Sequence, residues 1–564
     1  MNVNGFLTSQ IGYDLGDPKR ALIRSSRSDY VPAGATFEVA PVAAEDSTPH
    51  PVLRGTVRYW GTVWKAHWWE IDFSALEEEG IYDVTVRAPA SDEVLLRSET
   101  VQIGENLLWQ ATVEPIALEQ MEARAQLARN GIGWKDCGAE WREANSHAST
   151  IIGLCELLNG GFEWLSDEQV KRLQAQIIHG CDYLALLQDA AQRIGAPDGA
   201  LIHEIPNHMV LIPGDTAQSV VALAYAGRLL ADTEPGKSAM YIQRAARAMN
   251  YLILDARPYG GEGFSPSNHG APPSFQVPDE FMTRDLAMML WGCVQLCAAG
   301  QMHYQRHAAR LAREVMSRQV PEARAEGGLY GHFYTFASAE FTEKANCHHH
   351  VGHDTGTTFP HYIAPLLEMA SRWPTHPDAG RWRDCVRRFA ESYLIPACKC
   401  NPFYLLPMGY FAGQGLLSFC GPWHGINTSY GYGAALAAAC EGVSSDPTLR
   451  QIVVGNLQWI CGLNAGITAK SFAGCVFWKG SVPEGQAMAY SQIHGLGRRW
   501  TGNWTGIRGT ISNGFDVNPQ FQLVIDPTLE NDEPLLYTDE DWIPHGAGFL
   551  AGLTALRGRK RFEI

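Results

Sequence analysis

Acidic and aromatic residues gather in one short stretch, GIGWKDCGAEWREANSH, which covers residues 131–147. It contains Asp136 and Glu140 beside Trp134, between two segments with the apolar spacing of helices. A second acidic run, YTDEDW, places Glu540 between two aspartates. Two carboxyl groups on opposite sides of a cleft suit cleavage of a glycosidic bond, and flat indole faces suit the apolar face of a sugar ring. The same aromatic residues could instead only pack loops onto a core.

Histidines are concentrated in CHHHVGHD, residues 347–354. Its cysteine, histidine and aspartate side chains are ligand types that hold zinc or another divalent ion. Because their spacing matches no standard site, a transition metal is not expected, and contacts with a sugar are favoured. The predicted substrate contacts are Trp134, Tyr334, His349, His350, His353, Asp354, Trp423, His494 and Arg498.

The elements that must position these residues are mainly helical. Twelve segments have helical apolar spacing, and they cover 107–129, 147–158, 166–192, 214–231, 239–256, 280–300, 303–319, 359–373, 379–398, 429–443, 446–463 and 540–556. Loops after even-numbered segments have about two to seven residues, whereas loops after odd-numbered segments have about seventeen to seventy-five, far above ordinary loop lengths. This alternation predicts six antiparallel hairpins closed into an (α/α)6 barrel, with the long loops together on one rim.

The first hundred residues have a different pattern. Short runs such as RALIRS, TFEVAPV, AHWWEIDF and GIYDVTVR are rich in β-branched and aromatic residues and are separated by turn-forming residues. We expect a small β-sandwich over residues 1–104, followed by the barrel over residues 105–564.

Composition excludes several classes of partner. The chain carries 60 acidic residues against 44 Lys and Arg, a formal net charge of −16, so a nucleic acid backbone would be repelled. The opening MNVNGFLTSQIGYDLGDPKR has no apolar signal region, and no later segment offers an uninterrupted membrane span. A cytoplasmic protein with no membrane partner is therefore expected, and the 13 cysteines are expected to be reduced.

Several segments together resemble one enzyme family. YTDEDWIPHGAGFLAGLTAL resembles the general-acid segment of family-9 glycoside hydrolases, the endoglucanase family, with Glu540 at the position of the acid. The segment VGNLQWICGLNAGITAKSFAG is similar to the family's Leu-Gly-x-Asn-Pro…Ser-Phe stretch, and FLTSQIGYDLGDPKRALI is similar to the start of the immunoglobulin-like module found before many family barrels. The resemblance implies a mainly α protein, an (α/α)6 barrel preceded by a small immunoglobulin-like β-sandwich.

One motif departs from that family. The family has an Asp-Ala-Gly-Asp motif whose last Asp is the general base and whose first helps to hold the attacking water. Here the corresponding residues are Asp136, Cys137, Gly138 and Ala139, so the first carboxylate is present and the expected base is replaced by a methyl group. Glu140 follows directly, but adjacent residues point in different directions. The base is then Asp136, Glu140 or absent.

The favoured function is cleavage of a glycosidic bond in an oligosaccharide, with Glu540 as general acid and Asp136 or Glu140 acting on the nucleophile. Two alternatives stay open. One is a lyase or phosphorylase that uses the same cleft without a water-activating base, and the other is a catalytically inactive sugar-binding protein. No cofactor is required by this chemistry. The resemblance permits structural calcium without locating it, and the oligomeric state is open.

Overall fold

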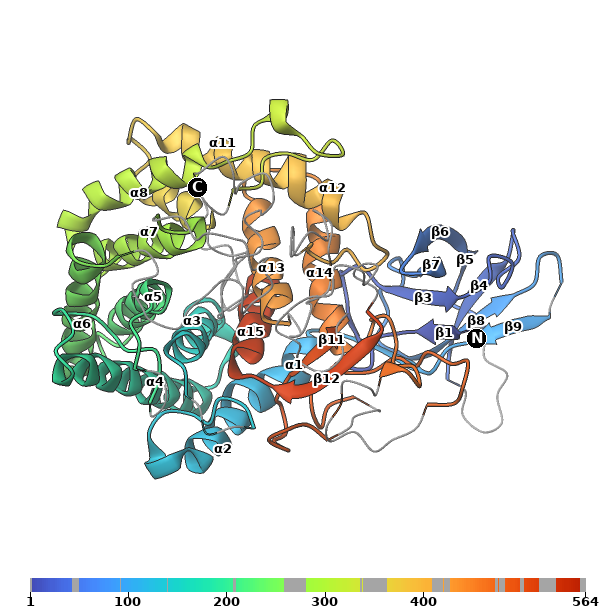
Figure 1. Cartoon of the computed structure of the whole chain (residues 1–564). Helices are drawn as coiled ribbons and strands as arrows, with labels where there is room; N and C mark the ends of the chain where they lie inside the picture. Colours follow the sequence, from blue (N-terminus) through green and yellow to red (C-terminus); the bar gives the residue numbers. More distant parts are fainter. Residues whose placement is uncertain are drawn as a thin grey trace.

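The structure is a computed structural model of the chain, and it describes residues 3–42, 50–91, 93–138, 140, 142–205, 209–257, 280–334, 337, 363–407, 419, 427–471, 475, 482–497, 502–516 and 534–557. Within these residues, strands fill the first hundred positions and helices follow from Leu107 onward. Figure 1 shows the two parts side by side, with the strands at one end of the molecule.

Two sheets make the N-terminal β-sandwich. The first has the order β1-β3-β7-β6, and the second has the order β2-β10-β8-β4-β5 with β9 paired to β8. The strands are β1 Asn4–Leu7, β2 Tyr13–Asp14, β3 Arg20–Ser25, β4 Thr36–Pro41, β5 Leu53–Thr56, β6 Arg58–Val63, β7 Ala66–Asp72, β8 Gly80–Arg87, β9 Val94–Arg97 and β10 Val101–Gly104. Their inward-facing side chains, including Ile23, Phe37, Trp69 and Val84, form a core separate from that of the helices. This is the layered packing that alternating strands produce.

Helices after the sandwich form the (α/α)6 barrel. The helices that begin at the predicted long-loop rim are α3 Ala144–Gly160, α5 Pro213–Leu229, α7 Thr283–Ala298, α10 Pro365–Arg372, α13 Asn427–Cys440 and α15 Ile543–Arg557. The helices that return to it are α1 Leu107–Val113 with η1 Glu114–Glu119 and α2 Gln120–Leu127, α4 Asp167–Arg193, α6 Pro235–Leu254, α8 Gln305–Ser317, α11 Ala379–Phe389 with η8 Ala390–Leu394 and α12 Ile395–Cys398, and α14 Thr448–Cys461. In Figure 1, α3, α5, α13 and α15 lie inside the ring that α4, α6, α8, α11 and α12 form.

Residue type explains which helices are inside. Helices α5, α7, α13 and α15 are buried on nearly every face, and α4, α8 and α11 have one apolar face and one polar face. Small residues let the inner helices approach closely, since a Cβ on Gly431 of α13 would lie 2.1 Å from the backbone of Gly548 in α15. The first turn of α4 is fixed by a capping box between Ser166 and Gln169.

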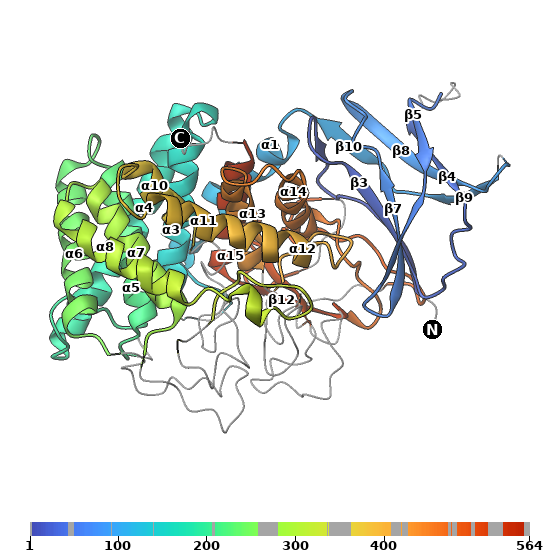
Figure 2. The same ribbon diagram turned by 90° about the horizontal axis from the view of Figure 1, so that it is seen from above.

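Figure 2 shows the barrel from above, with the sandwich packed against the side that carries α14 and α12. Among the described helices, none is both long enough and apolar enough to cross a membrane.

The two domains share a buried aromatic cluster. Trp64 lies in the turn between β6 and β7 and is only 6% exposed. Its ring centroid lies 5.9 Å from that of Phe403 and 6.3 Å from that of Trp459 in the barrel. Trp64 and Lys65 both have φ near 54°, a left-handed conformation that costs a side-chain-bearing residue roughly 1 kcal/mol. Packing of the indole against the barrel offsets that strain.

One predicted boundary is wrong. The last helix is expected to begin at residue 540, but α15 begins at Ile543, and Leu536–Asp541 form strand β12, paired antiparallel with β11, Ser512–Asp516. The apolar spacing of the helix continues by chance into residues 540–542. The pairing of β12 with the distant strand β11 overrides it.

We predict that Trp64→Ala lowers the free energy of unfolding by about 3 to 5 kcal/mol, because it leaves a cavity between the domains. The measurement is urea unfolding followed by fluorescence and circular dichroism. A loss below about 1 kcal/mol would show that the cluster does not hold the domains together. Lys65→Gly is the control, and it should raise stability by up to about 1 kcal/mol because glycine accepts the left-handed turn.

Candidate active site

A buried arginine joins the two acidic segments that the sequence singles out. Arg124, at the end of α2, is 0% exposed. One terminal nitrogen donates to the carbonyl oxygens of Lys135 (2.8 Å) and Asp136 (2.7 Å), and the other donates to the carbonyl and to Oδ2 of Asp541 (3.1 and 3.2 Å). The backbone N–H of Ile543 also donates to the Asp136 carbonyl at 3.1 Å. These contacts bring residues 135–136 beside the end of β12.

A β-bulge directs Glu540. Ser512 is paired with Asp541 and Gly514 with Thr538, so Asn513 on β11 faces two residues, Asp539 and Glu540, on β12. Bulges of this kind re-aim side chains and are common beside active sites. Here the result is a hydrogen bond of 2.9 Å from Asn513 Nδ2 to Glu540 Oε2.

The direction of the hydrogen bonds behind Asn513 can be deduced. The backbone N–H of Thr428 donates to Nδ1 of His545 at 3.0 Å, so Nδ1 accepts and Nε2 carries the proton. Nε2 then donates to Asn513 Oδ1 at 2.7 Å. With its oxygen occupied as an acceptor, the Asn513 amide group faces Glu540 as a donor. His545 is buried, and burial lowers its pKa to about 3, which keeps it neutral.

Glu540 has the titration expected of a proton donor near neutral pH. Burial is the largest influence and raises its pKa to about 7, helped by the charges of Asp541 and Glu143. Hydrogen bonds from the Cys137 thiol and from Asn513 act in the opposite direction, since they stabilise the carboxylate. The Cys137 contact places Glu540 directly against the altered motif.

Asp136 is enclosed more fully than the sequence suggests. It is 1% exposed, and its Oδ2 accepts the Glu143 backbone N–H at 3.4 Å. Burial and then the charge of Glu143 raise its pKa well above the usual range. Asp136 therefore lies beside the candidate acid as a buried group.

Glu143, and not Glu140, is the buried glutamate of this loop. The Glu140 side chain is 62% exposed and its Oε1 lies 3.5 Å from Lys135 Nζ. The Glu143 side chain is 8% exposed, and its charge acts on both Asp136 and Glu540. The surface exposure of Glu140 speaks against its prediction as a catalytic group.

Trp134 needs a correction. Predicted as a sugar contact, it is 0% exposed; its ring stacks on His147 with centroids 5.3 Å apart, and its Nε1 donates to Gln176 at 3.0 Å. These contacts pack Trp134 against α3, which carries His147, and α4, which carries Gln176. Trp504 is a half-buried indole at this site: its Nε1 donates to Asp539 Oδ1 at 3.2 Å, and a Cβ on Gly138 would lie 2.7 Å from its ring.

Two other residues that were predicted to contact the sugar, Tyr334 and His494, lie among the described residues. Tyr334 is half-buried and its backbone N–H donates to Arg318 O at 2.9 Å. His494 is half-buried and is held through its backbone N–H to Thr510 O at 2.8 Å. The predicted residues that lie outside the described residues are His349, His350, His353, Asp354, Trp423 and Arg498, together with Ala139.

Sequence reasoning assigned no site role to Arg124, Cys137, Glu143, Asn513 or His545. Glu143 and Cys137 lie in the acidic stretch and could have been found by asking which residues share a face with Asp136. Arg124, Asn513 and His545 carry no local signal, because each acts through a contact distant in sequence.

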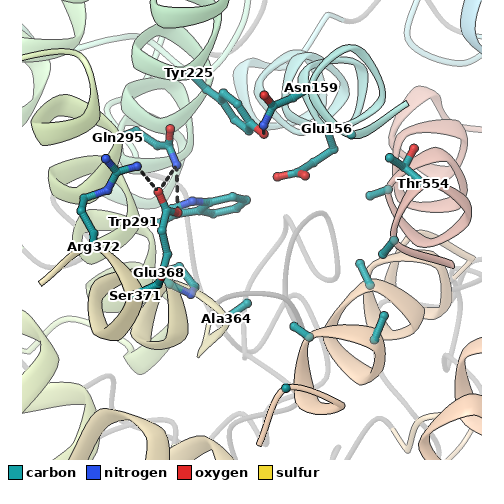
Figure 3. Close-up of a pocket in the computed structure, with 18 of the residues that line it drawn as sticks. Glu156, Asn159, Tyr225, Trp291, Gln295, Ala364, Glu368, Ser371, Arg372 and Thr554 are labelled. Carbon is teal, nitrogen blue, oxygen red and sulfur yellow. Dashed lines mark hydrogen bonds and ion pairs between the residues drawn. The ribbon is translucent and has the colours of Figure 1, made fainter. Parts of the chain in front are cut away.

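A cavity of about 570 Å³ lies elsewhere in the barrel, and Figure 3 shows its lining. Its walls include Glu156 of α3, Tyr225 of α5, Trp291 of α7 and Glu368 of α10. Glu156 is 12 residues beyond the start of α3, which is about 18 Å along a helix. This cavity therefore belongs to the end of the barrel opposite Glu540, so it is not the candidate active site.

We predict that Glu540→Gln stabilises the protein above pH 7 relative to the natural chain. Because the folded pKa is raised, the stability contributed by Glu540 is present below its unfolded pKa and is lost as pH rises through about 7. The stability difference between variant and natural chain should grow by roughly 2 kcal/mol from pH 4.5 to pH 8, less than the full shift because the side chain is partly exposed. Urea unfolding at these two pH values measures it, and a pH-independent difference would contradict the shift.

Comparisons with known proteins agree on the fold. No family model matches the chain, and no curated protein matches it. A metagenome-derived glycoside hydrolase family 9 endoglucanase has a TM-score of 0.63 at 16% identity, covering 98% of this chain and 99% of that one. A single-residue variant of a thermostable endoglucanase from Alicyclobacillus acidocaldarius (TM-score 0.61, 14% identity, 98% and 99% covered) and a family 9 protein of Bacteroides ovatus (0.61, 14%, 98% and 98%) are also similar. The chain therefore has the fold of family-9 glycoside hydrolases over nearly its whole length.

Proposed function

We propose that this protein cleaves a glycosidic bond in an oligosaccharide, with Glu540 as the general acid and Asp136 as the group that positions the nucleophile. The observation that carries the proposal is the partly exposed carboxyl of Glu540, whose pKa of about 7 leaves a substantial protonated fraction at neutral pH. That carboxyl contacts Cys137, next to Asp136.

The acid step follows from the hydrogen bonds. Oε2 accepts from Asn513 at 2.9 Å, so the transferable proton is held on Oε1. Transfer of that proton to the oxygen of the departing sugar removes the need to expel an alkoxide. Asn513 then stabilises the carboxylate that forms, and neutral His545 keeps the amide in the donating orientation.

The residues that could act on the nucleophile support a more limited proposal than those around the acid. Position 139 is alanine, Glu140 is largely exposed, and Asp136 is buried and held by the Glu143 backbone. Asp136 is therefore proposed to orient the incoming nucleophile rather than to take its proton directly. The missing base favours one further candidate, a phosphorylase or lyase reaction with the same acid. A sugar-binding protein would not need a buried acid at the leaving-group position.

We predict that Glu540→Gln lowers turnover of an oligosaccharide panel, neutral and uronic, by about 10²-fold or more, because the general acid is lost. Products are analysed by mass spectrometry in oxygen-18 water with phosphate present. Label at a new reducing end identifies hydrolysis, whereas phosphate-bearing products or products lighter by one water identify phosphorolysis or elimination.

The matched control for this experiment is Glu163→Gln, an exposed carboxyl away from the site, which should keep full turnover. Turnover by Glu540→Gln equal to that of the control would remove Glu540 as the acid. If the natural chain binds sugar but forms no product, only the alternative of a sugar-binding protein fits the result.

We further predict that Asn513→Ala moves the alkaline limb of kcat/KM upward by about one pH unit. Removing a donor to the charged carboxylate, a bond to a charged group of about 1.5 kcal/mol, raises the pKa of Glu540. Profiles of kcat/KM against pH for both proteins test this. A downward shift of that limb would mean that Asn513 does not stabilise the ionised acid.

A further inference from the structure

Three metal-binding side chains meet beside the candidate site. Glu143 immediately precedes α3, and His203 and Glu204 come from the segment between α4 and α5. One ligand atom of each lies within 4.8 Å of the others, and all three residues are buried. Two carboxylates and one imidazole are a donor set that divalent metal ions accept.

The backbone holds these ligands in place. Glu143 and Glu204 form an antiparallel bridge, and the N–H of Ala144 donates to the His203 carbonyl at 2.8 Å. The N–H of His203 donates to the Val210 carbonyl at 2.8 Å. A site fixed on the first turn of a helix and a short bridged strand loses little entropy when an ion binds.

The orientation of His203 matches that of a metal ligand. Its Nδ1 lies 2.6 Å from Asp215 Oδ2, and its Nε2 is directed toward Glu143 Oε1, 3.8 Å away. In metal sites the non-coordinating ring nitrogen of a histidine usually donates to a carboxylate, which sets the tautomer and aims the other nitrogen at the ion. Asp215, in the first turn of α5, has that position here.

The three side chains lie among further buried acidic residues. Glu143, Glu204 and Asp215 surround the His203 imidazole, and Asp136 accepts the Glu143 backbone N–H. The nearby Arg142 directs its terminal nitrogen to the backbone carbonyls of Arg129 and Ile132. Arg284 is paired with Asp285. Buried carboxylates in excess are costly unless they are protonated or bind a cation.

Asp136 gives an independent sign of a missing partner. Its Oδ2 accepts the Glu143 amide, and its Oδ1 is buried and has no hydrogen-bond partner among the described residues. Buried polar atoms are rarely left in this condition unless a water or an ion completes them.

We infer that Glu143, His203 and Glu204 bind one divalent transition-metal ion of the zinc or manganese class, with Asp215 as the positioning residue for His203. A histidine nitrogen among the ligands disfavours calcium, which takes oxygen ligands. Three protein ligands leave at least one position for water. The inference does not depend on the proposed cleavage of glycosides, because it concerns only the ligands and the charge they bury.

The test is metal binding by the full-length protein after treatment with a chelator. Isothermal titration with Zn²⁺, Mn²⁺ and Ca²⁺ is combined with metal analysis after gel filtration and with thermal melting. We expect Zn²⁺ or Mn²⁺ to raise the melting temperature. His203→Ala and Glu204→Gln should each remove one bound ion per chain or weaken it by about 100-fold, and Asp215→Asn should weaken it by about 10-fold to 100-fold.

The matched controls are His303→Ala and Glu322→Gln, which change one exposed histidine and one exposed carboxyl and should bind the ion as the natural chain does. Glu204→Gln keeps the size of the side chain, so a weaker affinity of this variant for the ion reports the loss of a ligand oxygen and not a change in packing. Absence of ion binding by the natural chain would overturn the inference. Equal binding by the natural chain and by both ligand variants would also overturn it, because the ion would then be held elsewhere.

Discussion

The guanidinium of Arg124 is the contact on which the arrangement of the candidate site depends. It is fully buried and donates to the backbone at Lys135 and Asp136 and to both the backbone and the side chain of Asp541. A planar group with five donors can satisfy several acceptors from two segments at once, which lysine could not do. The loop after α2 and the strand before α15 are more than 400 positions apart in sequence, and this side chain joins them together with the hydrogen bond from Ile543 N–H to the Asp136 carbonyl.

Around that contact, the protein combines burial with directed hydrogen bonds to set the properties of Glu540. Burial raises its pKa, and donors from Asn513 and Cys137 limit the rise. Neutral His545 completes the chain because the Thr428 backbone N–H occupies its Nδ1. Each of these side chains comes from a different part of the barrel, so the proton-donating character of Glu540 is a property of the closed barrel and not of β12 alone.

The loop between α2 and α3, which carries Asp136, also carries the buried charge of Glu143. Glu143 acts on the titration of both Asp136 and Glu540, and its backbone is bridged to Glu204. A cation proposed at Glu143, His203 and Glu204 would reduce the negative charge that both carboxyl groups experience. The altered motif at residues 136–139 and the acidic cluster behind it are therefore physically coupled, although they are separate features of the sequence.

The sequence by itself determined the architecture. Alternating short and long connections between twelve helical segments predicted the (α/α)6 barrel, and strand-like runs predicted the β-sandwich before it, because apolar periodicity is a local property that each segment carries alone. The presence of Asp136 and Glu540 and the alanine at position 139 could also be read directly. Only the tertiary structure decided that Trp134 is buried, that Glu140 faces Lys135, and that Glu143 faces the site. Burial, hydrogen-bond direction and charge coupling arise from residues that are distant in the chain, so no local pattern could reveal them.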